Sequence, residues 1–230
     1  MNEMFINSVY FGCALSLICY WIGVQTAKRF PVTICNPLLI ASILVIVVLA
    51  AGSISFETYH QSAEKLTWLL TPATVSLAVP MYREVQLLRK NLAAILVSLF
   101  SGCVAGMLTI WGIGRLFGVS EELYLSLLPK SITTAIAMGV SEEIGGVPTV
   151  TVGMVVFTGL LGAIIVKTVC RLFRITHPIA VGLACGNAAH AIGTSKALEI
   201  GEVEGAMSSL AIVAAGIFTV VLAPLMGMLY

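Results

Sequence analysis

Charged residues are scarce in this chain of 230 residues. Only 10% of them are Asp, Glu, Lys or Arg, whereas 59% are hydrophobic and the mean hydropathy is +1.04. Soluble domains carry about 25% charged residues, so the composition excludes a soluble globular protein and favours an integral membrane protein. A net charge of +1 also provides no basic face for nucleic acid.

Enzyme motifs are missing as well. The sequence contains no G-x-S-x-G nucleophile elbow, no H-E-x-x-H zinc motif and no P-loop, which favours a protein that is not an enzyme. Its six cysteines form no C-x-x-C pair, and most lie in apolar runs, where a thiol packs as a small hydrophobic group. We therefore expect neither a metal site nor a cofactor.

Long apolar runs separate the few charged residues. Most of these runs reach the length of about 20 residues that an α-helix needs to cross a hydrocarbon core about 30 Å thick. We therefore predict an all-α, polytopic integral membrane protein with about six spanning helices, forming a single domain over residues 1–230. No basic segment precedes the first run and no small-x-small cleavage site ends it, so we expect a retained helix there. The predicted spans are 4–27, 30–56, 66–82, 91–114, 144–166 and 205–230.

Two further segments, 121–146 and 177–201, are less apolar than the predicted spans. The first has Pro129 and Lys130 where a simple helix would have its middle. In the second, glycines at 182, 186 and 193 are candidate helix breakers. Irregular backbone is tolerated at membrane depth only where protein or a water-filled cavity surrounds it. We predict two re-entrant or discontinuous elements, with a full seventh span over 121–146 as the alternative.

Positive charge gathers in three places, which the positive-inside rule assigns to the cytoplasm. Two predicted spans separate the first cluster from the second, so both can lie inside. The second and third clusters agree only if segment 121–146 enters and leaves on the same side, or is a broken helix counted with a partner. The clusters are Lys28 and Arg29; Arg83, Arg89 and Lys90; and Lys167, Arg171 and Arg174.

The sequence also carries an internal repeat. The stretch "PATVSLAVPM" from Pro72 aligns with "PKSITTAIAM" from Pro129, and "RLFGVS" from Arg115 resembles "RLFRIT" from Arg171. Chance similarity between apolar segments is the alternative. Duplicated halves with interrupted helices are typical of secondary transporters, whose binding sites lie near the membrane midplane where the broken helices meet.

Polar side chains gather in the two less apolar segments. A helix broken inside the membrane leaves free N–H groups at the start of its second half, and these groups favour an anion together with the helix dipole. Neighbouring hydroxyls and a cation would suit a small carboxylate. The predicted substrate site comprises Lys130, Ser131, Thr133 and Thr134 in the first segment and Asn187, His190, Thr194, Ser195 and Lys196 in the second.

Each of these candidates also has a structural interpretation. Hydroxyls in membrane helices commonly bond to the backbone or to a neighbouring helix, and Lys196 can extend to the membrane interface. His190 is the only histidine inside a predicted membrane element. Ionisable groups at that depth are commonly functional, and an ordinary pKa of about 6.5 suits a proton relay. We predict proton coupling at His190, with a neutral histidine bonded between helices as the alternative.

Three motifs in order resemble the LrgB/CidB family of antiholin-like membrane proteins, to which the plastid glycolate/glycerate transporter is also similar. They are "TPATVSLAVPMY", "LPKSITTAIAMGVSEEIGG" and the stretch from "GLACGNAAHAIGTSK" to "TVVLAP". The resemblance adds a P-A-T box at Pro72, Ala73 and Thr74 to the expected substrate-binding residues. It also matches Thr133 and Thr134 to paired threonines, and His190, Gly193 and Thr194 to a further box. Asn187 departs from the pattern, because a threonine is usual there.

The resemblance implies two functions. Some members oppose holin-like proteins and restrain murein hydrolase activity and lysis, usually with a small LrgA/CidA-type membrane partner, while others are described as carriers of small monocarboxylates. We expect a multi-pass cell-membrane transporter of the pyruvate, glycolate, glycerate and lactate class, proton-coupled and acting with such a partner. The alternative is an antiholin-like regulator of autolysis that transports no solute. G-x-x-x-G spacing, as at Gly102 and Gly106, suits close helix packing or a homo-oligomer.

Overall fold

A computed structural model describes residues 8, 10–30 and 35–230, without the side chains of Leu70 and Thr74. Every regular element in these residues is a helix, which confirms the all-α prediction. The contacts divide the chain into two compact units, Met1–Ser76 and Leu77–Tyr230. Parts of the predicted spans 4–27 and 30–56 fall on residues 4–7, 9 and 31–34, which lie outside the described residues.

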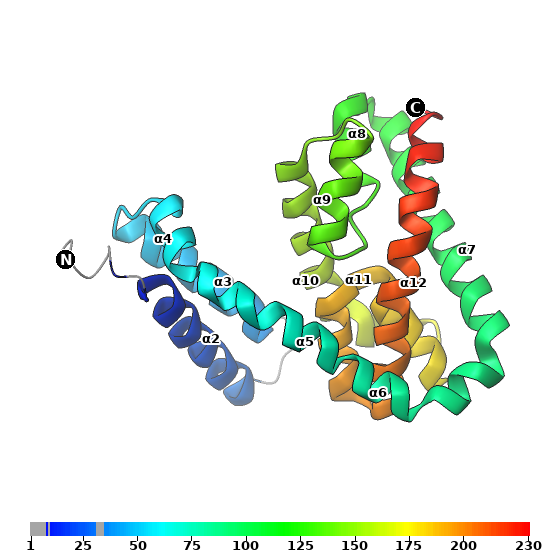
Figure 1. Ribbon diagram of the computed structural model, residues 1–230, viewed down its shortest axis with the longest axis horizontal. Helices are drawn as coiled ribbons and strands as arrows, with labels where there is room; N and C mark the ends of the chain where they lie inside the picture. Colours follow the sequence, from blue (N-terminus) through cyan, green and yellow to red (C-terminus); the bar gives the residue numbers. More distant parts are fainter. Residues whose placement is uncertain (1–7, 9, 31–34) are drawn as a thin grey trace. The chain divides into compact units, whose positions relative to one another are not determined.

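The first unit is built on two neighbouring helices, α2 (Phe11–Arg29) and α3 (Pro37–Ala51) (Figure 1). Asn36 caps α3 by accepting hydrogen bonds from the N–H groups of Leu38 and Leu39. The following α4 (Phe56–Ala63) returns to the start of α2, where a Cβ on Gly12 would lie only 2.6 Å from the carbonyl oxygen of Tyr59. The unit ends with the 3₁₀ helix η1 (Glu64–Leu69) and α5 (Leu70–Ser76).

The predicted span 66–82 is not one continuous helix. It is divided among η1, α5 and α6 (Ala78–Arg83). Pro72 and Pro80 each lie within the first turn of a short helix, the place where a missing N–H group is tolerated, whereas a proline in a helix interior removes a hydrogen bond. The prediction of a single spanning helix there is therefore wrong, because apolar composition alone does not report these interruptions.

Three long helices dominate the second unit: α7 (Val85–Phe117), α10 (Pro148–Leu172) and α12 (Glu202–Gly227). Among the described helices these three are long and apolar enough to cross a membrane, and they cover most of the predicted spans 91–114, 144–166 and 205–230. α3, with 15 residues, is a shorter apolar helix. The described part of the chain therefore supports three of the six predicted spans at full length.

The segment 121–146 forms a helical hairpin, which we call the first hairpin. It consists of α8 (Glu121–Leu127), a connection over 128–133 and α9 (Thr134–Glu143). The chain turns back on itself, because the Thr151 hydroxyl donates to the carbonyl oxygen of Ser126 on α8 (2.9 Å) and lies in hydrogen-bond contact with the hydroxyl of Ser141 on α9 (2.7 Å). Both helices of the hairpin therefore lie beside the start of α10, and the segment is two short helices that turn back, not one continuous helix.

The helix α11 (Pro178–Ile200) is also a hairpin, which we call the second hairpin. Its backbone leaves the helical conformation at Ala189 (φ −134°, ψ 17°) and His190 (φ 41°, ψ −133°). A Cβ on Gly193 would come closer than 3.0 Å to the carbonyl oxygen of Cys185. Eight residues of unbroken helix would separate these positions by about 12 Å. The two halves of α11 therefore lie side by side, as predicted for a discontinuous element.

The glycines of α11 do not break it, contrary to the expectation from their positions. They instead let backbones approach closely, since a Cβ on Gly182 or Gly186 would come closer than 3.0 Å to a carbonyl oxygen of α12. The break falls on Ala189 and His190, where positive φ is imposed on a non-glycine residue. Tertiary packing around the tip, and not local glycine flexibility, holds this conformation.

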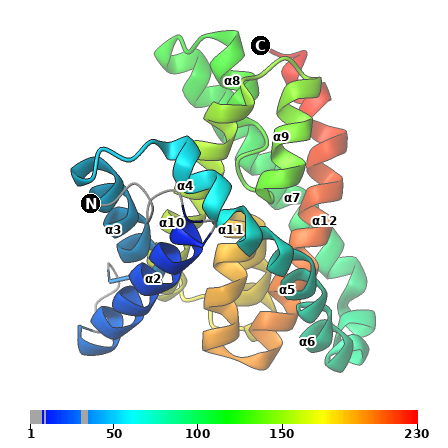
Figure 2. The ribbon, with the colours of Figure 1, turned by 60° about the vertical axis from the view of Figure 1, so that its left-hand side comes forward.

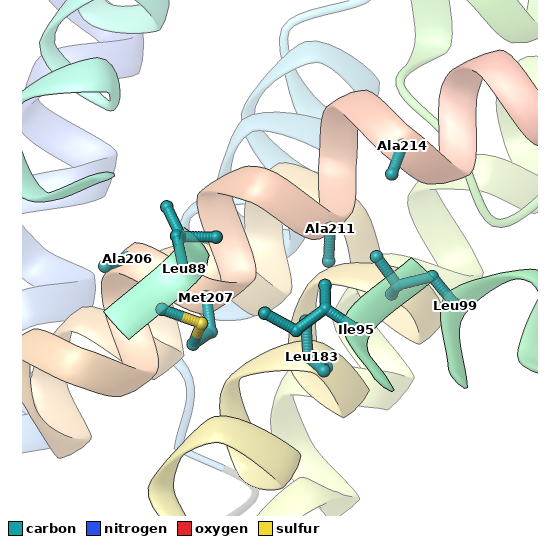
Figure 3. Close-up of a cluster of buried hydrophobic side chains, with 8 residues drawn as sticks. All are labelled: Leu88, Ile95, Leu99, Leu183, Ala206, Met207, Ala211 and Ala214. Carbon is teal, nitrogen blue, oxygen red and sulfur yellow. The ribbon is translucent and has the colours of Figure 1, made fainter. Parts of the chain in front are cut away.

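The core of the second unit joins α7, α11 and α12 (Figure 3). α7 and α12 run in the same direction, because early residues of both helices share one apolar cluster and late residues share another. Figures 1 and 2 show the first hairpin along one half of α12 and the second hairpin along the other half. The first cluster contains Leu88, Ile95, Leu99, Leu183, Ala206, Met207, Ala211 and Ala214.

The second and third basic clusters lie at the same end of this unit. Arg83 pairs with Glu202 at the start of α12 (3.1 Å), and Cys170 near the end of α10 packs against Ala197 of the second hairpin. The second and third clusters could agree only if segment 121–146 entered and left on one side or was a broken helix counted with a partner, and the first hairpin enters and leaves at one end. We call the end that carries Arg83 and Arg171 the inner end, since the positive-inside rule assigns it to the cytoplasm, and the other the outer end.

The repeat of "RLFGVS" and "RLFRIT" has a structural counterpart. The first stretch ends α7 immediately before the first hairpin, and the second ends α10 immediately before the second hairpin. The hairpins consequently enter from opposite ends of the unit. The aligned prolines differ in setting, because Pro72 lies in α5 whereas Pro129 lies at a hairpin tip.

Candidate functional site

Both hairpin tips reach one small cavity inside the second unit. Ser131 and Ile132 come from the tip of the first hairpin, and Asn187 lies just before the tip of the second. The cavity has a volume of about 30 Å³, enough for a water molecule or two but not for a carboxylic acid of three carbons. Its walls are Gly102, Cys103, Gly106, Met107, Ile110, Leu128, Ser131, Ile132, Asn187, Ala215 and Thr219.

Ser131 and Asn187 are the two predicted site residues that the structure brings to this cavity. The Ser131 hydroxyl accepts a hydrogen bond from Lys130 Nζ (3.2 Å), and Asn187 Oδ1 accepts one from the Cys103 thiol (3.2 Å). Both side chains are half-buried. A thiol is a weak donor, so the Asn187 amide is held loosely and keeps its Nδ2 donors for another partner.

Lys130 borders a second cavity, of about 160 Å³, with its hydrocarbon stem. The wall of this cavity is apolar and also includes Tyr124, Leu127 and Met154, while Lys130 Nζ bonds to Ser131 Oγ. Among the described side chains, no carboxylate forms an ion pair with Lys130. At the tip of the first hairpin, the ammonium group of Lys130 thus has the Ser131 hydroxyl as its neighbour.

His190 and Thr194 hold the tip of the second hairpin and do not line the cavity. His190 is 4% exposed, and its Nε2 lies 3.0 Å from the carbonyl oxygen of Val155, so Nε2 carries the proton and donates it. The Thr194 hydroxyl donates to the carbonyl oxygen of His190 (3.0 Å), which leaves Ser208 as the donor in their 2.7 Å hydrogen bond. This geometry matches the histidine bonded between helices that the sequence left as an alternative.

The remaining candidates lie away from the cavity walls. Thr133 precedes α9 and forms no side-chain cap, and Thr134 is the first residue of that helix. The exposed Ser195 donates to the carbonyl oxygen of Ala191 in its own helix, and Lys196 pairs with Glu199. In the first unit, Pro72 and Ala73 are exposed on α5, while the side chain of Thr74 lies outside the described residues.

Sequence reasoning missed a buried hydroxyl network inside the first hairpin. Ser126, Ser141 and Thr151 are all fully buried, and the N–H group of Val147 also donates to Ser126 Oγ (2.7 Å). It also missed Cys103 in the cavity wall. The sequence signal for this network was the presence of isolated serine and threonine residues within otherwise apolar runs.

The long apolar helices, with the two hairpins between them, define the class as a multi-pass membrane protein. Comparison with known proteins then gives the family. A family model described as LrgB-like matches residues 16–229, and the chain belongs to this family. Neither the description of the family nor the printed name of the relatives below is that of an enzyme.

Three relatives illustrate the match. The chain is 38% identical over 221 residues to proteins named "Antiholin-like protein LrgB" from Bacillus mycoides (strain KBAB4), Bacillus cereus (strain B4264) and Bacillus anthracis (strain CDC 684 / NRRL 3495). In each case 94% of both chains is covered. No solved structure matches the chain.

Proposed function

We propose that this protein is a membrane carrier of a small monocarboxylate of the pyruvate, glycolate, glycerate and lactate class. The observation that supports it is the pair of hairpins that enter the second unit from opposite ends and line one cavity with residues at or next to their tips. Interrupted helices that meet in this way are the usual setting of a binding site in secondary transporters.

The chemistry at the tips suits a carboxylate. The N-terminus of α9 follows the first tip directly, and Thr133 does not cap it with its side chain, so its backbone N–H groups and the helix dipole favour a negative charge. Lys130 adds a positive charge and Ser131 a hydroxyl from the same tip. Asn187 lines the same small cavity as Ser131, so a carboxylate there would have one donor from each hairpin.

Proton coupling at His190 is part of this proposal. Because Nε2 donates to Val155, the ring nitrogen left to accept a proton is Nδ1. Protonation would place a charge at the tip of the second hairpin, three residues after Asn187. A change of charge there would favour rearrangement of the tip, and so link proton uptake to movement of the solute.

Uptake by the purified protein tests the carrier proposal. Proteoliposomes with an imposed proton gradient are supplied with labelled pyruvate, glycolate, glycerate or lactate, with and without an LrgA/CidA-type partner. We expect gradient-dependent accumulation of at least one acid, and a lower rate for Asn187→Ala. The matched control is Ser195→Ala, since Ser195 is exposed and bonds only within its own helix. No uptake of any acid with the partner present would contradict the proposal.

The printed name of the relatives favours a second candidate function. In this alternative the chain is an antiholin-like regulator that restrains murein hydrolase activity and autolysis with a holin-like partner, without moving solute. It requires the polar residues only for helix contacts, so Asn187→Ala should leave autolysis unchanged in cells. Under the carrier proposal, Asn187→Ala changes autolysis wherever uptake of the transported acid controls autolysis in the cell.

We also propose that the protein resides in the cell membrane and pairs there with a small LrgA/CidA-type protein. The second unit exposes large apolar side chains along its spanning helices, such as Val97, Phe157 and Val221. Lipid or another helix covers such side chains in a bilayer. Co-purification of the partner with the full chain, and the mass of the complex in detergent, separate a hetero-oligomer from a homo-oligomer.

A further inference from the structure

A groove of about 530 Å³, which we call the inner cavity, adjoins the small cavity on its inner side and is open to the surface at Ala94, Ser98 and Ala184. It lies between α7 and the first half of α11 and begins at Asn91 and at His177, the residue that precedes α11. It ends at Gly102 and Asn187, which also line the small cavity. Its walls are mostly apolar, with Ser98 as a further polar group along the way.

The cavity that Lys130 borders continues the series on the outer side. It shares Ile110 with the small cavity and extends to Val119 and Tyr124. The three cavities therefore follow one another along α7 from the inner to the outer end. The lining residues of α7 are 91, 94, 95, 98, 99, 102, 103, 106, 107, 110, 113 and 114.

This series recurs every three or four residues, which is the spacing of a single face of an α-helix. From Asn91 to Gly114 that face is about 35 Å long at a rise of about 1.5 Å per residue. A hydrocarbon core is about 30 Å thick. One face of α7 is thus lined by cavities over a length sufficient to cross the membrane.

Asn187 separates the first two cavities. A Cβ on Gly102 would come closer than 3.0 Å to Asn187 Nδ2, so the amide group rests directly on the backbone of α7. On its other side Asn187 Oδ1 accepts the hydrogen bond from Cys103. Among the described residues this thiol is its only side-chain partner, so little free energy opposes rotation of the amide away from α7.

We propose that the solute crosses the protein along this face of α7 and that Asn187, seated on Gly102, is the constriction that it must displace. The proposal rests on the proposed carrier function and specifies its path. The inner cavity receives the acid, and its apolar walls at Ile95 and Leu99 suit the carbon end of the molecule. Asn187 Nδ2 donates to the carboxylate as the amide turns, and Ser131 and Lys130 take over beyond it.

Thiol labelling tests the constriction without relying on uptake. A chain that retains Cys103 and has alanine at the five other cysteines is treated from the inner side with a charged, membrane-impermeant methanethiosulfonate reagent. We expect slow labelling of Cys103 and, in Asn187→Ala, labelling about five- to tenfold faster, because removing a hydrogen-bonded amide lowers the barrier by about 1 kcal/mol. Asn187→Ser serves as a second variant should the first fail to fold.

Two cysteine positions in a cysteine-free background provide the controls. Ser98→Cys faces the inner cavity and should be labelled rapidly from the inner side. Val97→Cys replaces a neighbour that is 68% exposed on the apolar outside of α7, and should resist the charged reagent within the bilayer. Equal labelling of Ser98→Cys and Val97→Cys would overturn the proposed path along this face of α7. The absence of labelling at Ser98→Cys would do the same.

The outcomes for the constriction and for the carrier are distinct. Equal labelling rates of Cys103 with Asn187 and with alanine would overturn the constriction. Labelling as expected, combined with no uptake of any acid, would support the constriction and overturn the proposed carrier function. Faster labelling of Cys103 together with slower gradient-driven uptake by Asn187→Ala would support both.

Discussion

A single methyl group at Gly102 tests how Asn187 closes the path. In Gly102→Ala the new Cβ would come closer than 3.0 Å to Asn187 Nδ2, whereas carbon and nitrogen atoms in contact prefer about 3.5–4.0 Å. The amide must therefore turn away from α7 and lose its hydrogen bond from Cys103. Overpacking costs about 1–3 kcal/mol and the lost hydrogen bond about 1 kcal/mol.

These costs are partly offset in the folded state. Alanine stabilises a helix interior by about 1 kcal/mol relative to glycine, so Gly102→Ala should change overall stability by no more than about 1–3 kcal/mol. The displaced amide instead acts on transport. An amide already turned away from α7 no longer presents Nδ2 to the entering carboxylate, and losing about 1–3 kcal/mol of that hydrogen bond lowers the initial uptake rate about 5- to 150-fold.

The assay compares initial uptake rates in proteoliposomes with the apparent melting temperature in detergent. The matched control is Gly112→Ala, which adds the same methyl group to the same helix at a position where the Cβ meets nothing within 4 Å. We expect normal uptake from the control and a slightly raised melting temperature. Wild-type uptake by a folded Gly102→Ala protein would refute the role given to Asn187.

Three further predictions follow from the hairpins. His190→Ala should abolish gradient-driven accumulation more than solute exchange, and equal loss of both would show that the ring only packs. Because His190 has φ 41°, His190→Gly should be more stable than His190→Ala by about 1 kcal/mol, measured as a melting temperature about 2–4 °C higher. Thr151→Val removes two hydrogen bonds to buried oxygens and should cost about 1–3 kcal/mol by the same measurement, whereas Ser195→Ala should change it little.

The arrangement of charge predicted the first hairpin better than hydropathy predicted the spans. The clusters around Arg89 and Arg171 agreed only if segment 121–146 entered and left on the same side or was a broken helix counted with a partner, and in the structure this segment turns back on itself. This requirement involves the whole chain, because the side on which a loop lies depends on how many times the chain has crossed the membrane before it. The division of 66–82 was missed, since apolar composition reports burial from water and not the continuity of the helix.

The site was predictable in part for a related reason. Residue type and position along the chain put Ser131 and Asn187 in one predicted site, and both line one cavity in the structure, while their role in binding stays a prediction. Which face of a short helix a residue occupies depends on where the helix breaks, and the break at Ala189 and His190 has no glycine to mark it. Thr194 was therefore placed in the cavity by its neighbours in sequence, although it faces Ser208 in the structure.

The polar residues at membrane depth fall into two groups with different consequences for function. Thr151 and Thr194 each make more than one hydrogen bond to buried groups, so they are already satisfied and fix the hairpins in place. Ser131 and Asn187 have one weak or mobile side-chain partner each, and both face a cavity.

A purely structural regulator needs only the first group. Polar atoms that face a cavity lack hydrogen bonds that helix packing could supply, and this lowers the stability of the folded protein. In a membrane protein that bound nothing, the second group would lower stability without serving a function. The loosely held pair is therefore the observation that supports the proposed carrier over an antiholin-like regulator that moves no solute.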